Sequence, residues 1–167
     1  MAADQAMTEI EAFAGRPVVQ IAVVVRDFDA ALARYRTMLH TGRWHTMTFG
    51  SKDHVRTEYR GRPNEFSARL ALNDQTPQLE LIQPLEGAST YRDWLEQRGE
   101  GVHHLGVVVD SVSDAIEQAE QAGCEVVQSG FGMGPQRDGA WAYIDTSGVL
   151  GVMVEAIEPA SELPTED

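Results

Sequence analysis

Four side chains that can bind a divalent metal ion stand at matching places in two similar stretches of the chain. Residues 20–32 (QIAVVVRDFDAAL) return as residues 104–116 (HLGVVVDSVSDAI), and residues 79–84 (LELIQP) return as residues 154–159 (VEAIEP). The side chains at the matching polar positions are Gln20, Glu80, His104 and Glu155. A repeat of apolar residues indicates a duplicated fold. A repeat that also duplicates an amide or imidazole and a glutamate indicates a site.

An amide oxygen, an imidazole and two carboxylates form a mixed nitrogen and oxygen ligand set. Such a set suits Zn²⁺, Ni²⁺, Co²⁺, Fe²⁺ or Mn²⁺ better than the thiolate cages of structural zinc do. Four protein ligands leave open positions for substrate oxygens, and the ion would then polarise a carbonyl and hold the resulting enolate. A neighbouring carboxylate would move the proton. The pattern therefore predicts one divalent ion per site and proton transfer next to a carbonyl.

Each of these residues also has a purely structural interpretation. Gln20 can cap an apolar strand, and Glu80 can be a surface carboxylate. Glu155 lies in an apolar run, where an unpaired charge would cost free energy. His104 competes with His103, because strand alternation places neighbouring side chains on opposite faces. The repeat favours His104, since it aligns with Gln20.

The elements that would position these residues follow the same order in both halves. The first strand is an apolar, β-branched run typical of a buried strand. A helix follows it, capped by Asp27 or Asp29 and closed by Thr41 and Gly42. The predicted strands of this half are residues 18–25, 55–60, 66–72 and 78–82. Residues 44–74 are otherwise irregular.

The second half repeats this order after a short helix at 91–98, which Ser89 caps and Gly99 ends. Its own helix is capped by Ser111 or Ser113. The predicted strands are residues 102–109, 125–128, 140–145 and 149–157. A glycine-rich connecting loop at 131–139 is predicted between two of them.

These elements predict an α+β fold in which two tandem βαβββ modules form a curled mixed sheet. The two modules enclose a cup, and residues at equivalent places converge inside it. The predicted divisions are an N-terminal tail or arm over a partner (1–16), one domain (17–158) made of module one (17–84), a linker helix (85–101) and module two (102–158), and an acidic C-terminal tail (159–167).

The composition favours a soluble cytoplasmic protein without nucleic-acid or membrane partners. The 167 residues carry a net charge of −13, which opposes binding to nucleic acid or to an anionic membrane surface. No apolar run approaches the roughly 18 residues of a membrane helix, and the N-terminus has no signal-peptide pattern. The single cysteine, Cys124, excludes an internal disulfide and fits a reducing compartment.

The span 18–158 resembles the vicinal oxygen chelate superfamily, which includes glyoxalase I, methylmalonyl-CoA epimerase, bleomycin-resistance proteins and extradiol dioxygenases. The opening motif at 20–35 is similar to the first strand and helix of that superfamily. The segments at 79–85, 98–106 and 148–155 look most like the methylmalonyl-CoA epimerase branch. The resemblance implies paired βαβββ modules, a divalent metal ion between them and a homodimer.

Two positions depart from the epimerase-like pattern. That pattern has a histidine where this chain has Gln20, and its catalytic glutamate on the third strand would fall near Ala68 or Arg69. The Gln, Glu, His, Glu set instead matches the ligand pattern of eukaryotic-type glyoxalase I. There the last glutamate is thought to act also as the base, which implies that role for Glu155. An extradiol dioxygenase needs two histidines and one carboxylate, a set that Gln20 breaks.

The sequence therefore predicts a glyoxalase-like or epimerase-like metalloenzyme, an isomerase or lyase. It would act through a metal-stabilised enolate on a small carbonyl or acyl-thioester substrate. Glu155 would be the base, or Glu80 if it leaves the metal. The alternative is a metal-free protein of the bleomycin-resistance type that binds or sequesters a small molecule in the same cup. Substrate specificity would lie in residues 43–74 and 129–141.

Overall fold

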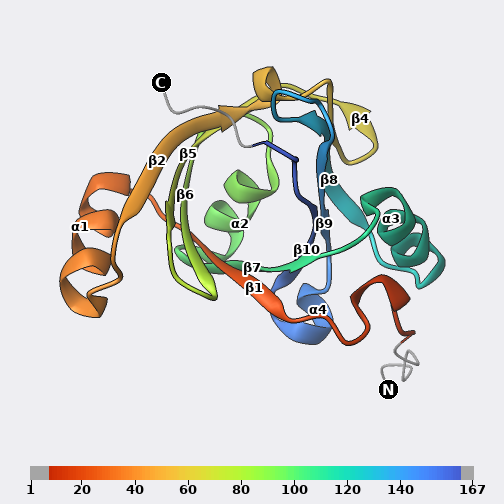
Figure 1. Cartoon of the computed structure of the whole chain (residues 1–167), viewed down its shortest axis with the longest axis horizontal. Coiled ribbons are helices and arrows are strands. Elements are labelled where there is room, and N and C mark those ends of the chain that lie inside the picture. The colour runs from red at the N-terminus through yellow and green to blue at the C-terminus, as the bar shows by residue number, and fades with distance from the viewer. Residues whose placement is uncertain (1–7, 163–167) are drawn as a thin grey trace.

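A single ten-stranded mixed sheet, curled into a half-barrel, forms the body of the protein (Figure 1). The computed structural model describes residues 8–162. The beginning of the predicted N-terminal tail and the end of the predicted acidic C-terminal tail lie outside these residues. The strand order is β2-β5-β6-β1-β7-β10-β9-β8-β3-β4. The α+β class and the paired modules predicted from the sequence are confirmed.

The first module supplies one half of the sheet. Its elements are β1 (Val18–Val24), α1 (Phe28–Leu39), β2 (Trp44–Gly50), β5 (Phe66–Asn73) and β6 (Gln78–Gly87). The Asp27 carboxylate caps α1 by accepting a hydrogen bond from the Ala30 amide at 3.0 Å. The helix ends at Leu39, just before the predicted end at Thr41 and Gly42, because His40 adopts the left-handed conformation with φ of 49°.

The second module repeats this arrangement on the other side of a central seam. Its elements are β7 (Gly101–Val108), α3 (Val112–Gln121), β8 (Val126–Met133), β9 (Gly139–Ile144) and β10 (Met153–Glu158). Ser111 caps α3 by accepting from the Asp114 amide at 3.1 Å. Within each module the first and last strands pair in parallel, and the modules join through the antiparallel β1–β7 ladder. The four strands that carry the predicted ligands are therefore neighbours at the centre of the sheet.

The irregular stretch at 44–74 contains a strand that the sequence analysis did not predict. In β2 the inward residues Met47 and Phe49 are half-buried, whereas Thr46 and Thr48 point outward and are exposed. This alternation is itself a strand signal. The chain then crosses the mouth of the half-barrel through η2 (Ser51–Asp53) to β3 (Arg56–Tyr59) and β4 (Arg62–Pro63). Here β3 pairs with β8, so the strand predicted at 55–60 belongs to the sheet of the second module.

Two boundaries in the second module also differ from the prediction. Strand β8 continues to Met133, so the connecting loop shortens to residues 134–138. Residues 149–152 are not strand, because α4 (Ser147–Leu150) forms one helical turn before β10. Gly151, with φ of 79°, ends that turn.

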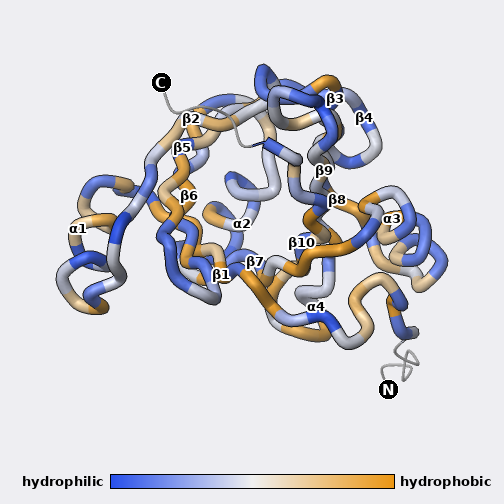
Figure 2. Tube along the Cα trace, viewed as in Figure 1, coloured by the Kyte–Doolittle hydropathy of each residue, from blue (hydrophilic) through white to orange (hydrophobic). Residues whose placement is uncertain are grey.

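Helices cover both faces of the sheet. On the convex side α1 and α3 pack against the two modules, and apolar residues line the strands beneath them (Figures 1 and 2). On the concave side α2 (Thr90–Arg98) is placed inside the half-barrel, and Ser89 caps it as predicted. Tyr91, Trp94 and Leu95 of α2 join the largest buried cluster. This helix closes one end of the cup.

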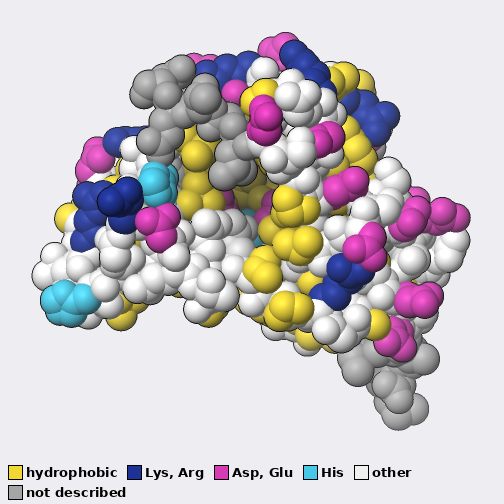
Figure 3. Space-filling view, viewed as in Figure 1, with side chains coloured by type: hydrophobic (Ala, Val, Ile, Leu, Met, Phe, Trp, Pro, Cys, Tyr) yellow, Lys and Arg dark blue, Asp and Glu magenta, His cyan; other side chains and the backbone are white. Residues whose placement is uncertain are grey.

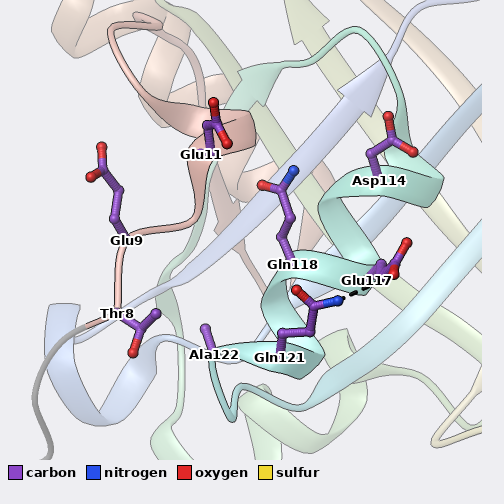
Figure 4. Close-up of a pocket in the computed structure, with 8 residues that line it drawn as sticks. All are labelled: Thr8, Glu9, Glu11, Asp114, Glu117, Gln118, Gln121 and Ala122. Carbon is purple, nitrogen blue, oxygen red and sulfur yellow. Dashed lines mark hydrogen bonds between the residues drawn. The ribbon is translucent and has the colours of Figure 1, made fainter.

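The N-terminal segment packs on its own chain. In η1 (Glu11–Phe13) the Ala12 amide donates to the Gln118 side chain of α3 at 2.8 Å. Arg16 binds the Val108 carbonyl at 3.2 Å and the Asp110 carboxylate. The groove between this segment and α3 is lined mainly by carboxylates and amides and lies on the convex side of the sheet (Figure 4). Residues 8–16 therefore lie against α3 and the end of β7 of the same chain.

Candidate metal centre

The four predicted ligands come together on the concave face, one from each of the four central strands. Their strands are β1 for Gln20, β6 for Glu80, β7 for His104 and β10 for Glu155. The strand registers explain the meeting, because Ala22 lies opposite both Glu80 and His104, while Gly106 lies opposite both Gln20 and Glu155.

The imidazole nitrogen Nε2 of His104 is the centre of this group. It lies 3.1 Å from Gln20 Oε1, 3.5 Å from Glu80 Oε2 and 3.0 Å from Glu155 Oε2. All four side chains are nearly buried, and His104 has no exposed surface. Three oxygens from three strands thus face one nitrogen.

A glycine makes this approach possible. A Cβ atom at Gly106 would stand 2.9 Å from Gln20 Cβ and 3.2 Å from its Oε1. Carbon atoms that are not bonded pack at about 3.5 Å or more. Gly106 therefore gives Gln20 its position beside Glu155.

A second amide orients Gln20. The Nε2 group of Gln20 donates to Gln78 Oε1 at 2.9 Å, and Gln78 Nε2 donates to the Asn73 carbonyl at 3.2 Å. These two bonds fix which end of the Gln20 amide is the oxygen, and that oxygen faces His104. The sequence analysis did not single out Gln78, although Gln78 is the first residue of the strand predicted at 78–82.

The two histidines do not lie on opposite faces as alternation predicts. Ala22 pairs with His104 and Val23 pairs with Val102, so His103 is an extra residue without a partner on β1. Such a β-bulge rotates the bulged residue out of the alternating pattern. As a result His103 Nδ1 lies 2.9 Å from His104 Nδ1, and both rings are fully buried.

Burial controls the charges of the group. Burial lowers the pKa of His104 to about 3, so the ring is neutral. It raises the pKa of Glu155 to about 8, although a hydrogen bond from Tyr143 acts in the opposite direction. Burial and the charge of Glu155 together raise the pKa of Glu80 well above its usual range. The site thus disfavours two bare carboxylates unless a cation accompanies them.

The donor set fits a divalent ion in chemistry and in spacing. Two ligand atoms bound to one ion at about 2.1 Å lie about 3.0 Å apart at a right angle and about 3.4 Å apart at a tetrahedral angle. The distances from His104 Nε2 to the Gln20 and Glu155 oxygens, 3.1 and 3.0 Å, fall in that range, and the distance to the Glu80 oxygen, 3.5 Å, lies just above it. In their present rotamers the His, Cys, Asp and Glu side chains of residues 8–162 alone form no group of three that would hold an ion. A complete shell therefore requires the Gln20 oxygen and a rotation of a carboxylate.

Apolar and aromatic side chains surround the rest of the concave face, and the space-filling view shows a hollow there with apolar side chains at its rim (Figure 3). Trp141 and Tyr143 of β9 lie in contact at 5.2 Å between ring centroids. Tyr143 also shares a hydrogen bond of 2.7 Å with Tyr91 of α2. These three rings, Trp141, Tyr143 and Tyr91, pack together on the concave face and are called the aromatic wall below.

The first module carries no acid where the epimerase-like pattern has its glutamate. Ala68 is fully buried on the concave face. Arg69 points to the convex side, where it pairs with Asp29 at 3.0 Å and stacks over Phe28. Neither position supplies a base.

The two histidines of the irregular stretch lie apart from this group. His45 pairs with Asp74 at 2.9 Å near the surface. His54 is buried, where it accepts from Trp141 Nε1 at 2.7 Å and lies 2.9 Å from the Gly50 carbonyl. A histidine in this irregular stretch is expected at the surface, or else facing the cup, and His54 is not at the surface.

Comparison with known proteins agrees with this architecture. Residues 19–144 match the model of the Glyoxalase/Bleomycin resistance protein/Dioxygenase superfamily, that is, the vicinal oxygen chelate superfamily. The chain belongs to this superfamily. The uncharacterised protein YqjC from Bacillus subtilis (strain 168) is 27% identical over 88 residues. That match covers 53% of this chain and 62% of the Bacillus protein.

Solved structures of two methylmalonyl-CoA epimerases share the fold. The epimerase from Mycobacterium tuberculosis is 20% identical, with a TM-score of 0.60 over 93% of this chain and 95% of that one. A variant of the Streptomyces coelicolor epimerase in complex with 2-nitronate-propionyl-CoA is also 20% identical, with a TM-score of 0.61 over 87% of this chain and 98% of that one. At this level of identity the likeness establishes the fold.

Proposed function

We propose that this protein is a metal-dependent isomerase, epimerase or lyase that moves a proton next to a carbonyl of a small carbonyl or acyl-thioester substrate. The observation that carries the proposal is the meeting of Gln20, Glu80 and Glu155 oxygens around His104 Nε2 within 3.5 Å. Gln20, Glu80, His104 and Glu155 would hold one divalent ion, whether zinc, nickel, cobalt, iron or manganese.

A bound divalent ion would polarise the substrate carbonyl and stabilise the enolate that follows. The protein supplies the base. Glu155 is favoured, because burial in the absence of an ion raises its pKa to about 8, so the carboxylate binds a proton strongly once it moves off the ion. Glu80 is the second candidate base.

The apolar surroundings support the same chemistry. The buried side chains of Ala68, Trp141 and Tyr143 give this part of the concave face an apolar lining, which strengthens the electrostatic effect of each charged group there. Ala68 stands near the place where the epimerase-like pattern has its glutamate. The two carboxylates of the site, Glu80 and Glu155, are therefore both proposed metal ligands. This arrangement favours isomerisation or elimination by one base over epimerisation by two opposed bases.

A metal-free binding protein is the second candidate, and one observation favours it. With a proton on Nε2, His104 would donate to the Gln20 and Glu155 oxygens that it already contacts, so the polar groups would satisfy one another without an ion. Such a protein would bind an apolar small molecule against the aromatic wall.

A homodimer and a cytoplasmic location, both expected from the sequence, remain part of the proposal. Within residues 8–162 no helix combines the length and apolar character that crossing a membrane requires.

Metal content separates the two candidates. Tag-free protein purified without chelators should contain close to one divalent ion per chain by mass spectrometry, and His104→Ala should lose it. His45→Ala is the matched control, because His45 lies near the surface, and it should keep the ion. A wild-type protein that stays metal-free after incubation with all five ions would reject the enzyme proposal and favour the binding protein.

A further inference from the structure

A second histidine stands directly behind the proposed ligand. The bulge in β7 turns the His103 ring toward His104, and their Nδ1 atoms lie 2.9 Å apart. We infer that His103 is a positioning residue that keeps the proton of His104 on Nδ1, so that the Nε2 lone pair faces the site. This inference rests on the proposed metal site.

The hydrogen bonds behind His103 permit this proton order. His103 Nε2 lies 3.1 Å from Thr90 Oγ1, and the Thr90 hydroxyl lies 3.2 Å from Met153 Sδ, which can only accept. If Thr90 donates to Met153, its oxygen accepts the His103 Nε2 proton. His103 Nδ1 is then an acceptor, and it takes the Nδ1 proton of His104.

Ion binding at the other nitrogen calls for the same order, and it replaces the alternative in which His104 Nε2 donates to Gln20 Oε1 at 3.1 Å. His104 Nε2 can bind an ion only when it carries no proton. Each neutral imidazole has one proton, so that proton must then lie on Nδ1 and needs an acceptor. Within the described part of the chain, His103 is the group recorded at hydrogen-bonding distance from His104 Nδ1.

Packing holds the His103 ring in the orientation that this role requires. Its centroid lies 5.3 Å from that of Tyr91, 5.2 Å from that of Trp94 and 5.3 Å from that of Tyr143. No water reaches the ring, which is fully buried. Groups that orient a metal-binding histidine through its second nitrogen commonly change metal affinity by about 10–100-fold when they are replaced.

Nitrogen NMR of histidine-labelled protein tests the proton order directly. In zinc-loaded protein at pH 6, the proton on His104 Nδ1 should show a scalar coupling across the hydrogen bond to His103 Nδ1. The reverse order has Thr90 donating to His103 and puts the His104 proton on Nε2, where it faces the Gln20 oxygen. A His104 Nδ1 proton without this coupling, or a proton on Nε2 in protein that holds zinc, would overturn the inference.

Zinc affinity of three variants tests the consequence. His103→Phe keeps a ring but removes the acceptor, and it should weaken Zn²⁺ binding about 10–100-fold. His103→Asn restores an acceptor oxygen near the Nδ1 position and should recover most of that loss. His54→Phe is the matched control, because it removes a buried histidine that contacts Trp141 instead, and it should leave the affinity unchanged.

The two readouts separate this inference from the proposed function. If the wild type binds no metal, the proposed function fails, and the metal-free protein then decides the inference: a His104 Nδ1 proton coupled to His103 supports it, and a proton on Nε2 rejects it. If His103→Phe and His103→Asn lose affinity equally, with the fold of both intact by circular dichroism, ring packing rather than hydrogen bonding supports His104, and the inference is wrong.

Discussion

The two carboxylates of the site differ in ways that matter for chemistry. Glu155 lies 3.0 Å from His104 Nε2, whereas Glu80 lies at 3.5 Å. Without an ion, burial raises the pKa of Glu155 to about 8, and burial together with the charge of Glu155 raises the pKa of Glu80 well above its usual range. Both carboxylates therefore bind a proton strongly when they leave the ion, and Glu155, the nearer to His104, is the proposed base.

Glu155→Gln should abolish turnover while leaving the fold intact. The amide keeps the size and one oxygen ligand of the side chain but cannot take up a proton. We expect turnover to fall by about 10²–10⁴-fold, with metal binding weakened but measurable by titration. Glu80→Gln is the comparison, since it removes a carboxylate from the same site. Full turnover in Glu155→Gln protein that still holds its metal would assign the base elsewhere.

The raised pKa of Glu155 has a consequence for the stability of the metal-free protein. Its usual value of 4.5 applies in the unfolded chain, whereas its pKa in the folded protein is about 8. Between these values the folded state holds a proton that the unfolded state has lost, so the free energy of unfolding falls as pH rises. Urea unfolding with chelator should show the wild type losing stability from pH 5 to pH 8 relative to Glu155→Gln. An equal difference between the two proteins at both pH values would contradict the assigned pKa.

At the scale of the elements, the centre of the sheet was predictable and its surroundings were not. The ends of β1, β6, β7 and β10 follow from the repeat, because the same polar residue recurs at the same place in both halves. The bulge at His103 depends on how β7 pairs with β1, and no local pattern encodes a register. In β2 the alternation of Met47 and Phe49 with threonines was present in the sequence, but the histidine and glycine around it obscured the pattern.

Gly106 links the backbone of β7 to the position of Gln20. Gly106→Ala would place a Cβ atom 2.9 Å from Gln20 Cβ and from Ile157 Cδ1. We expect a loss of about 1–3 kcal/mol in the free energy of unfolding and weaker metal binding, because Gln20 must move. Urea unfolding and zinc titration measure the two effects.

Gly148→Ala provides the control for that substitution. Gly148 lies in the helical turn α4, and a Cβ atom there would meet no atom within 4 Å. The stability of the Gly148→Ala variant should be unchanged or slightly higher than that of the wild type. If both variants bind zinc like the wild type, Gln20 is not a ligand.

At the scale of the whole molecule, each module supplies two of the proposed ligands, so a bound ion would connect the two halves across the β1–β7 seam. An ion that binds only the folded state adds about 2.7 kcal/mol at a concentration of 100 times its Kd. For a domain of this size the Tm should rise by about 5–10 °C. Calorimetry with zinc and with chelator measures the shift, and His104→Ala should show none.

The placement of the ligands also bears on the ancestry of the chain. Gln20 and His104 occupy the same position of the first strand in each module, and Glu80 and Glu155 the same position of the last. Duplication of one βαβββ unit would leave the same two ligands in each module. The ligand pairs of the two modules differ only at residue 20, which is Gln where the second module has His104. Gln20→His would restore that equality. Because imidazole binds nickel, cobalt and zinc more strongly than an amide oxygen does, this variant should bind these ions more tightly than the wild type in a competition titration. Weaker binding would mean that the first module has since been remodelled around the amide, through Gln78 and Asn73, and that the two halves are no longer interchangeable.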